Sequence, residues 1–243
     1  MKKANKIILG ENWGVFLGAF ENNIDHQHYA VQINIPLFDA IVVTAANVEN
    51  ASSSTTIIPS NLKHKIHSDH PFLLILINPL DFINVEATIA AFKHPSVSGL
   101  QKIALSYCNG ETSSKAFETS IRKYLSELLA DIQPNIDNRI SKALEYLNAH
   151  KDRVVCLSEI ANYCCLSESR FLHLFKSELK ITYRRAQLWY RISQSFESLF
   201  KSNITETAYE FGFADSAHYS RTFKENFGFS PRELLKNSQF IQV

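Results

Sequence analysis

The chain has 243 residues, 45% of them hydrophobic, which is enough to bury one large core or two smaller ones. Residues 1–135 carry 10 Lys and Arg against 12 Asp and Glu, whereas residues 136–243 carry 15 against 12 and hold eight of the nine arginines. Because guanidinium groups bind phosphate and guanine edges, we expect the second part to contact nucleic acid, with a positive excess too small for non-specific coating.

No apolar run after Met1 resembles a signal peptide, and no stretch of about 18 apolar residues is long enough to span a membrane. We therefore expect a cytoplasmic protein without a membrane partner. The cysteines show no paired metal-ligand spacing, and two of them are adjacent, which disfavours an ordinary bridge. Free thiols are expected for Cys108, Cys156, Cys164 and Cys165.

The first half of the chain is expected to be rich in β-strands. Apolar and β-branched residues dominate 13–20 and 30–43, and residues 71–79 form a short apolar run closed by prolines. The polar stretch 50–56 is predicted to be a loop or hairpin tip, because its serines and threonines compete with regular backbone pairing. A polar loop is also expected around His64, His67 and His70.

Two short motifs in this region resemble those of the cupin barrel. His26-Gln27-His28 and Gln32 are followed by Pro59-Ser60-Asn61-Leu62-Lys63-His64, where cupins have H-x-H, a Glu and P-x-G-x-x-H around one metal ion. Gln32 replaces the Glu, and a neutral amide is a poor ligand for a divalent ion. The resemblance implies a degenerate cupin-like barrel that senses an effector and holds no cofactor. The alternative is a metal site formed by His26, His28 and His64.

Residues 115–132 are predicted to form an amphipathic helix. Its apolar positions recur at helical spacing: Phe117, Ile121, Tyr124, Leu125, Leu128, Leu129 and Ile132. This stripe either packs on its own barrel or pairs with a second copy in a homodimer. Pro134 ends the helix, so we expect an N-terminal domain over 1–133 and an all-α domain over 136–243, an α+β protein overall.

The helical domain contains an internal repeat. Leu157-Ser158-Glu159-Ile160-Ala161 returns as Ile204-Thr205-Glu206-Thr207-Ala208 at an offset of 47, and Phe171–Lys176 returns as Tyr219–Lys224 at an offset of 48. Each copy is predicted to be a short helix, a tight turn and a longer helix, the helix-turn-helix layout that places its second helix in the DNA major groove.

Helix-start signals support both copies. Asp137 is expected to cap a helix that ends near His150, and Ser230-Pro231-Arg232-Glu233 predicts one last short helix. Ser167 and Asp215 are expected to cap the longer helices of the repeat. In the second copy Asn203 caps the short helix and Gly212 suits the turn. Cys156 and Cys165 hold these two places in the first copy, whose cap and turn are therefore predicted to be weaker.

The spacing also predicts which faces are buried. Inward stripes are expected at Phe171, Leu174, Phe175 and Leu179, and at Tyr219, Thr222, Phe223 and Phe227. The opposite face of each longer helix remains for DNA. Arg221 is the strongest candidate for a base contact, because a bidentate arginine to guanine gives about 1–3 kcal/mol of discrimination. Leu172 is either a contact to a thymine methyl group or an ordinary exposed leucine.

Residues 183–201 contain neither glycine nor proline and are predicted to form one helix that connects the copies. Nineteen residues would span roughly 28 Å, which with the flanking helices approaches the ~34 Å between successive major grooves. Arg184, Arg185 and Arg191 on this helix either contact phosphates or form a plain solvated face.

Residues 137–236 resemble the DNA-binding domain of the AraC/XylS family of bacterial transcription regulators. The match is specific over Gly212–Lys224 and Phe227–Glu233. The resemblance implies base contacts by Ser169, Leu172, His173, Ser216, Ala217, Ser220 and Arg221. The phosphate contacts expected around them are Lys176, Arg184, Arg185, Arg191 and Lys224.

The family further implies a non-enzymatic regulator that binds double-stranded DNA beside promoters and usually activates transcription through RNA polymerase. Its N-terminal domain is expected to sense a small effector or a partner protein. Two alternatives remain, a cupin-type metalloenzyme fused to a DNA-targeting module and a protein that packages DNA without sequence preference, for which the basic excess is small.

Overall fold

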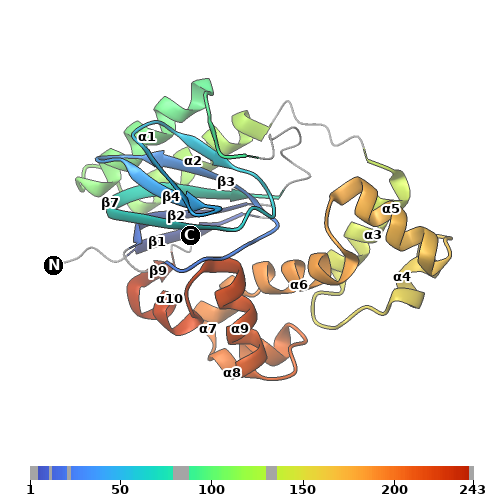
Figure 1. Cartoon of the computed structure of the whole chain (residues 1–243). Coiled ribbons are helices and arrows are strands. Elements are labelled where there is room, and N and C mark those ends of the chain that lie inside the picture. The colour runs from blue at the N-terminus through green and yellow to red at the C-terminus, as the bar shows by residue number, and fades with distance from the viewer. Residues whose placement is uncertain (1–4, 11–12, 21–22, 79–87, 130–135, 241–243) are drawn as a thin grey trace. The chain divides into compact units, whose positions relative to one another are not determined.

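The computed structural model describes residues 5–10, 13–20, 23–78, 88–129 and 136–240, and these fall into two compact units. The N-terminal unit combines residues 1–133 with 227–243 and is built on a β-sheet, and the helical unit is 134–226 (Figure 1). The predicted α+β class is confirmed. Sequence reasoning did not anticipate that the last 17 residues group with the N-terminal unit.

The sheet of the N-terminal unit is organised around one long strand, β7 (His64–Ile77). Its later part lies between β2 (Trp13–Phe20) and β3 (Val31–Pro36), and its first part pairs with β4 (Ile41–Ala45). The other strands are β1 (Asn5–Leu9), β5 (Val48–Ser52), β6 (Thr56–Ile58), β8 (Ala90–Ala91) and β9 (Ser238–Phe240).

The strands follow the order β8-β6-β3-β7-β2-β1-β9, with β4 and β5 as a side branch. The two ends of this path do not pair with each other within the described residues, so the sheet is open where a closed barrel was predicted. At one end β9 runs parallel to β1, with Ser238 opposite Asn5. The C-terminal segment therefore completes the sheet.

Several predicted strands are confirmed, with different limits. The run 30–43 is divided between β3 and β4, and β7 begins at His64 rather than at residue 71. The expectation of a polar loop around His64, His67 and His70 is wrong, because buried and exposed side chains alternate along these strand residues. The hairpin tip lies at Ala46 and Asn47, which have φ of 50° and 63°, and part of the predicted loop 50–56 is strand β5.

Two helices, α1 (Pro95–Cys108) and α2 (Ser114–Leu129), complete the core of this unit. The predicted amphipathic helix is confirmed as α2, whereas Ile132 and Pro134 lie outside the described residues. The apolar stripe of α2 shares one buried cluster with the sheet, including Phe117, Ile121, Leu125, Ile33 and Leu73. The stripe therefore packs on its own sheet.

The helical unit contains α3 (Asn138–Ala149), α4 (Leu157–Tyr163), α5 (Glu168–Leu179), α6 (Tyr183–Gln194), α7 (Phe196–Lys201), α8 (Ile204–Glu210) and α9 (Ser216–Phe227), the last residue of which belongs to the N-terminal unit. Asp137 caps α3 as predicted. The final helix, α10 (Pro231–Asn237), begins with the predicted capping box of Ser230 and Glu233. No helix in the described part of the chain is long and apolar enough to cross a membrane.

The prediction of one helix over 183–201 is wrong, because Ser195 separates α6 from α7. Its hydroxyl donates to the carbonyl oxygen of Ile192 at 2.7 Å and lies 2.9 Å from the hydroxyl oxygen of Tyr219. A serine that bonds a preceding carbonyl competes with the regular helix ladder. The connecting helix α6 therefore has 12 residues and a length of about 18 Å.

Candidate nucleic-acid interface

The two copies of the repeat have the same backbone hydrogen bonds in their turns. In the first copy, α4 and α5, Leu166 N–H donates to Ala161 O at 2.9 Å and Cys165 N–H to Asn162 O at 3.0 Å. In the second copy, α8 and α9, Phe213 N–H donates to Ala208 O at 2.8 Å and Gly212 N–H to Tyr209 O at 3.0 Å. Every one of these positions is related by the offset of 47, so the repeat in sequence is a repeat in backbone geometry.

Both turns pass through a left-handed residue, which is Cys165 with φ of 55° and Gly212 with φ of 66°. Glycine adopts this conformation without strain, whereas another residue costs roughly 1–2 kcal/mol. Gly212 also lies close to other backbone, since a Cβ there would come within 2.7 Å of Asp152 O. The position in the second copy thus requires glycine for two independent reasons.

The helix caps follow the predictions. Ser167 Oγ accepts from Arg170 N–H at 3.4 Å, and Asp215 Oδ1 accepts from His218 N–H at 2.6 Å. This bond to His218 is the largest cause of a lowered pKa of Asp215. The two caps are 48 residues apart, which places the extra residue of the second copy between Phe213 and Asp215.

The short helices differ as expected. Asn203 Oδ1 accepts from Thr205 and Glu206 N–H at 3.0 and 2.9 Å, whereas Cys156 begins α4 without a side-chain cap bond. All four cysteines are free thiols, as predicted.

The predicted inward faces are confirmed. Phe171, Phe175 and Leu179 are buried on α5, Leu174 is half-buried, and Tyr219, Thr222, Phe223 and Phe227 are buried on α9. Phe171 and Phe175 contact Tyr183 at ring distances of 5.3 and 5.6 Å, and Tyr219 contacts Phe213 at 5.1 Å. These contacts hold each longer helix with its other face outward.

The outward face of each longer helix carries the residues that were predicted to contact bases and phosphates. On α5, Ser169, His173 and Lys176 are exposed and Leu172 is 40% exposed. On α9, Ala217, Arg221 and Lys224 are exposed, and Ser216 and Ser220 are half-buried. None of the ion pairs among the described residues involves Arg221. Small side chains beside an exposed arginine suit close approach to a groove.

Helix α6 lies between the two copies and is bonded to both (Figure 1). Toward the first copy, Gln187 exchanges two hydrogen bonds with the backbone of Val155, at 2.8 and 3.2 Å, and Tyr183 donates to Val155 O at 2.9 Å. Toward the second copy, Arg191 donates to Phe211 O at 2.7 Å and to Gly212 O. The spacing between the copies is therefore held by specific side chains.

The prediction that Arg191 contacts phosphate is wrong. Its side chain is 5% exposed, and its guanidinium lies 4.4 Å from the ring centre of Phe213. Sequence reasoning missed this role and the role of Gln187. The pattern that could have indicated these buried roles is a spacing of four residues, which places Tyr183, Gln187 and Arg191 on one face of α6.

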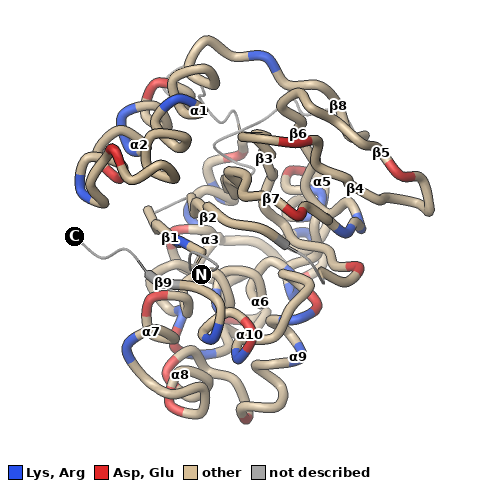
Figure 2. Tube along the Cα trace, turned by 90° about the vertical axis from the view of Figure 1, so that its left-hand side faces the viewer, with Lys and Arg blue, Asp and Glu red and all other residues tan. Residues whose placement is uncertain are grey.

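Two further arginines stabilise the helical unit. Arg139 pairs with Asp137 at 2.6 Å and Arg153 with Glu159 at 2.5 Å. Arg184 and Arg185 are exposed on α6, so they remain candidates for phosphate contact. Figure 2 shows basic and acidic residues interspersed along the chain, in keeping with the small net charge of +1.

The N-terminal unit brings together the three histidines of the cupin-like motifs. His26, His28 and His64 are buried, and their ring centres lie 4.3 to 5.6 Å apart. Burial, with a smaller effect of nearby His28, lowers the pKa of His26 to about 3, and burial is also the main cause that lowers the pKa of His28 and His64. The imidazoles are therefore neutral near pH 7. Gln32 is buried and pairs with His28 and Asn34.

Comparisons with known proteins agree with this geometry. A family profile described as a helix-turn-helix domain matches residues 160–237. The arabinose operon regulatory protein of Escherichia coli (strain K12) is 31% identical over 120 residues, which cover 48% of this chain and 41% of that protein. The transcriptional activator RhaS of Klebsiella pneumoniae (strain 342) is 30% identical over 115 residues, 46% of this chain and 41% of that protein.

Solved structures extend the likeness in fold to the N-terminal unit. An apo variant of ToxT from Vibrio cholerae strain SCE256 covers 95% of this chain and 99% of its own, with a TM-score of 0.65 and 14% identity. ToxT of the same strain with a bound unsaturated fatty acid covers 98% of both chains, with a TM-score of 0.60 and 15% identity.

The C-terminal part is thus a helix-turn-helix DNA-binding domain with two copies of the motif. Over its C-terminal part the chain is similar to transcription regulators that include the arabinose operon regulatory protein and RhaS. It spans about two fifths of the length of the curated relatives it matches, and all of that match lies within roughly half of this chain.

Proposed function

We propose that this protein is a sequence-specific transcription regulator, and that it activates transcription from sites beside promoters through RNA polymerase. The observation that carries the proposal is the pair of helix-turn-helix copies with equivalent turn bonds, buried aromatic faces and exposed outward faces, both bonded to α6. The names of the curated relatives support a regulator rather than an enzyme and favour activation.

We assign direct base contacts to Ser169, Leu172, His173, Ser216, Ala217, Ser220 and Arg221. Phosphate contacts are assigned to Lys176, Arg184, Arg185 and Lys224, all of which are exposed. Phosphate contacts position a protein on the duplex, whereas base contacts select the sequence. The small excess of basic residues agrees with a role for base contacts, because a protein that binds DNA through charge alone would need a larger positive charge.

Selection of binding sites from random double-stranded DNA by the full chain tests the proposal. We expect an enriched motif with two half-sites about one DNA turn apart, one for each copy. Transcription in vitro by bacterial RNA polymerase from a template with this motif beside a promoter should then increase. Failure to enrich any motif would contradict the proposed specificity, and a decrease in transcription would make the protein a repressor.

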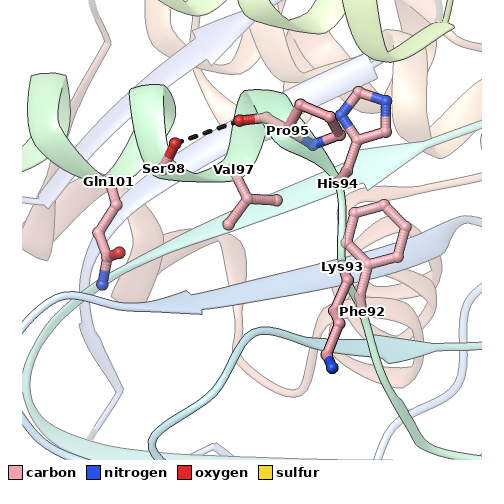
Figure 3. Close-up of a pocket in the computed structure, with 7 residues that line it drawn as sticks. All are labelled: Phe92, Lys93, His94, Pro95, Val97, Ser98 and Gln101. Atoms are coloured by element: carbon pink, nitrogen blue, oxygen red, sulfur yellow. Dashed lines mark hydrogen bonds between the residues drawn. The ribbon is translucent and has the colours of Figure 1, made fainter.

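We further propose that the N-terminal unit binds a small effector with an apolar body and an anionic group. A pocket of about 410 Å³ opens beside the start of α1 and is lined by Phe92, Lys93, His94, Pro95, Val97, Ser98 and Gln101 (Figure 3). This volume lies within the usual range for small-molecule sites. Lys93 supplies a cation next to the apolar surface of Phe92 and Val97, and the fatty acid described in a ToxT structure has the same combination of groups.

Thermal unfolding with an unsaturated fatty acid, compared with the corresponding alcohol, tests the effector. The acid should raise the midpoint more than the alcohol, and Lys93→Met should remove the difference because it removes the cation and keeps the apolar stem. Lys102→Met serves as the control, since this lysine lies on α1 outside the pocket lining. Equal shifts by acid and alcohol in the unmodified protein would contradict an anionic effector.

A further inference from the structure

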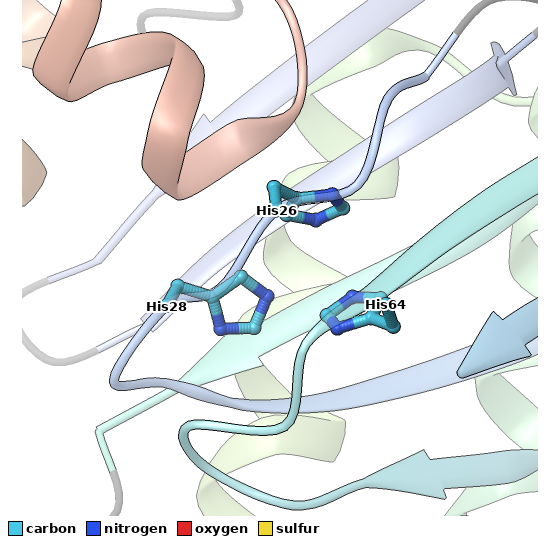
Figure 4. A group of neighbouring side chains, drawn as sticks. All are labelled: His26, His28 and His64. Atoms are coloured by element: carbon cyan, nitrogen blue, oxygen red, sulfur yellow. The ribbon is translucent and has the colours of Figure 1, made fainter. Parts of the chain in front are cut away.

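The three-histidine cluster of the N-terminal unit has the features of a binding site. His26 and His28 lie in the segment before β3, and His64 begins β7. The backbones of His26 and His64 exchange two hydrogen bonds, at 2.8 and 2.9 Å. One ring nitrogen from each histidine lies within 4.8 Å of the other two, and the side chains are grouped side by side (Figure 4).

Each of the three rings has its Nδ1 beside a backbone carbonyl. The Nδ1 atoms of His26, His28 and His64 lie 2.9, 3.0 and 2.9 Å from the carbonyl oxygens of Ile24, Ala30 and Leu62. A carbonyl oxygen can only accept and a neutral imidazole has one N–H, so His26 and His64 donate from Nδ1 and have their lone pair on Nε2. His28 has an acceptor oxygen beside each ring nitrogen, Ala30 O at Nδ1 and Gln32 Oε1 at Nε2, and its lone pair is on Nε2 once the amide of Gln32 turns away.

At least one of these lone pairs faces the buried interior without a partner. Within the described residues, Nε2 of His64 is buried and has no hydrogen-bond partner. Nε2 of His28 lies 3.0 Å from Oε1 of Gln32. Buried polar atoms are nearly always paired, so an orphaned nitrogen beside two more imidazoles requires an explanation.

We propose that His26, His28 and His64 bind one divalent transition-metal ion of the zinc class through their Nε2 atoms. Metal-binding histidines typically donate the other ring N–H to a carbonyl or carboxylate, and a backbone carbonyl lies at 2.9 to 3.0 Å from Nδ1 at all three positions. Imidazole nitrogen suits zinc, cobalt and nickel. Tetrahedral bonds of about 2.0–2.1 Å would bring the nitrogens to roughly 3.4 Å, so small ring rotations close the site.

The cluster contributes three neutral ligands and leaves a fourth position. Gln32, which replaces the glutamate of the cupin motifs, keeps the ligand set uncharged, so the bound ion would retain its full positive charge. A water molecule or an anionic small molecule is the ligand that this charge favours at the fourth position. The position of Gln32 beside His28 also means that its amide must turn away when the metal binds.

Hydrogen bonds connect the site to Phe227 and Gly228, which both belong to the N-terminal unit. The carbonyl that accepts from His26 belongs to Ile24, whose own N–H donates to Gly228 O at 3.1 Å. The neighbouring Asn23 donates from Nδ2 to Phe227 O at 2.9 Å. A metal ion that fixes the ring of His26 therefore also restrains Phe227 and Gly228 within the N-terminal unit.

The test uses the full chain purified without a histidine tag, stripped with a chelator and titrated with Co²⁺. We expect one ion per chain, visible absorption bands of a four-coordinate site, and displacement by Zn²⁺. His64→Ala and His26→Gln should lose this binding. His67→Ala and His70→Ala are matched controls, because these histidines lie on β7 outside the cluster, and they should bind as the unmodified protein does.

The proposal is overturned if the unmodified protein takes up no Co²⁺, or if His64→Ala and His26→Gln bind it undiminished while their circular dichroism remains native. X-ray absorption by the unmodified Co²⁺ complex gives an answer that does not depend on variants that fold. Three imidazole ligands are expected, and fewer than three would contradict the assigned ligand set. DNA site selection is independent of this result, so failure of the metal site would leave the proposed regulator untouched.

Discussion

The two helix-turn-helix copies share one backbone frame but differ in the side chains that stabilise it. The second copy has glycine in its left-handed turn, a capping asparagine and an arginine on its outward face. The first copy has Cys165, Cys156 and Leu172 at the corresponding or neighbouring places. Cys165 adopts the left-handed conformation in spite of its cost, so packing of the surrounding helices imposes the turn in the first copy, whereas local sequence already favours it in the second.

The largest expected losses of stability come from the two side chains of α6 that bond to neighbouring backbone, Arg191 and Gln187. Arg191→Met should destabilise the helical unit by about 3 kcal/mol, because it leaves the carbonyls of Phe211 and Gly212 without their charged donor. Gln187→Met, which releases the first copy, should cost about 1–2 kcal/mol, since its bonds are neutral. Urea unfolding followed by the fluorescence of Trp189, in a Trp13→Phe background, measures both.

Arg185→Met is the control for this experiment, because Arg185 is exposed on the same helix. It should change stability by less than about 0.5 kcal/mol, as is usual for surface substitutions. A loss at Arg185 equal to that at Arg191 would mean that the charge of α6, and not its contact with the second copy, stabilises the unit.

The turns provide the next comparison. Gly212→Ala should destabilise by about 2 kcal/mol or more, because alanine is strained at positive φ and its Cβ would approach Asp152 O. Cys165→Ala should be close to neutral, since both residues bear the same strain and Cys165 is exposed. Thermal or urea unfolding of the full chain compares the two, and equal losses would show that the turns are not as different as their sequences.

Much of the helical unit could be predicted because its signals are local. Caps at Ser167 and Asp215, the turn at Gly212 and the inward aromatics all depend on neighbours within a few residues. The break at Ser195 was not predicted, and one of the two partners of its hydroxyl, Tyr219, is distant in the chain. The role of Arg191 was hidden for the same reason, since its partners are 20 and 21 residues away.

The N-terminal unit was harder to predict from sequence. The alternation that makes β7 a strand passes through polar residues at His64, His67 and His70, so composition there resembles a loop. The pairing of β9 with β1 joins the two ends of the chain, and no short-range pattern indicates such a contact. The histidine motif was visible in the sequence, but the contacts that orient its rings required the positions of three backbone carbonyls.

On DNA, the two outward faces should also differ. Arg221→Ala should reduce discrimination between the selected site and its variants by about 1–3 kcal/mol, roughly 10- to 100-fold, while weak salt-sensitive binding persists. Leu172→Ala should cost less, because an apolar contact to a methyl group buries little area. Competition binding with mutated half-sites measures both. Arg122→Ala, an exposed arginine that pairs with Glu118 on α2, is the matched control.

If Arg221→Ala weakens binding equally on all sequences, Arg221 contacts phosphate and the assignment of a base contact is wrong. If Leu172→Ala relaxes the sequence preference more than Arg221→Ala does, the first copy, and not the second, is the main source of specificity. Either result would contradict the expectation that Arg221 supplies most of the sequence specificity.

The smallest expected change in stability concerns the left-handed turn of the first copy at Cys165. Cys165→Gly should stabilise the helical unit by about 0.5 kcal/mol, because relief of the left-handed strain outweighs the larger entropy that glycine gives the unfolded chain. The matched Cys165→Ala protein separates this backbone effect from loss of the thiol. If Cys165→Gly raises stability and leaves DNA affinity unchanged, the strain at Cys165 lowers stability only and has no role in DNA binding. If affinity falls instead, the strained turn is part of how α5 is positioned for the groove.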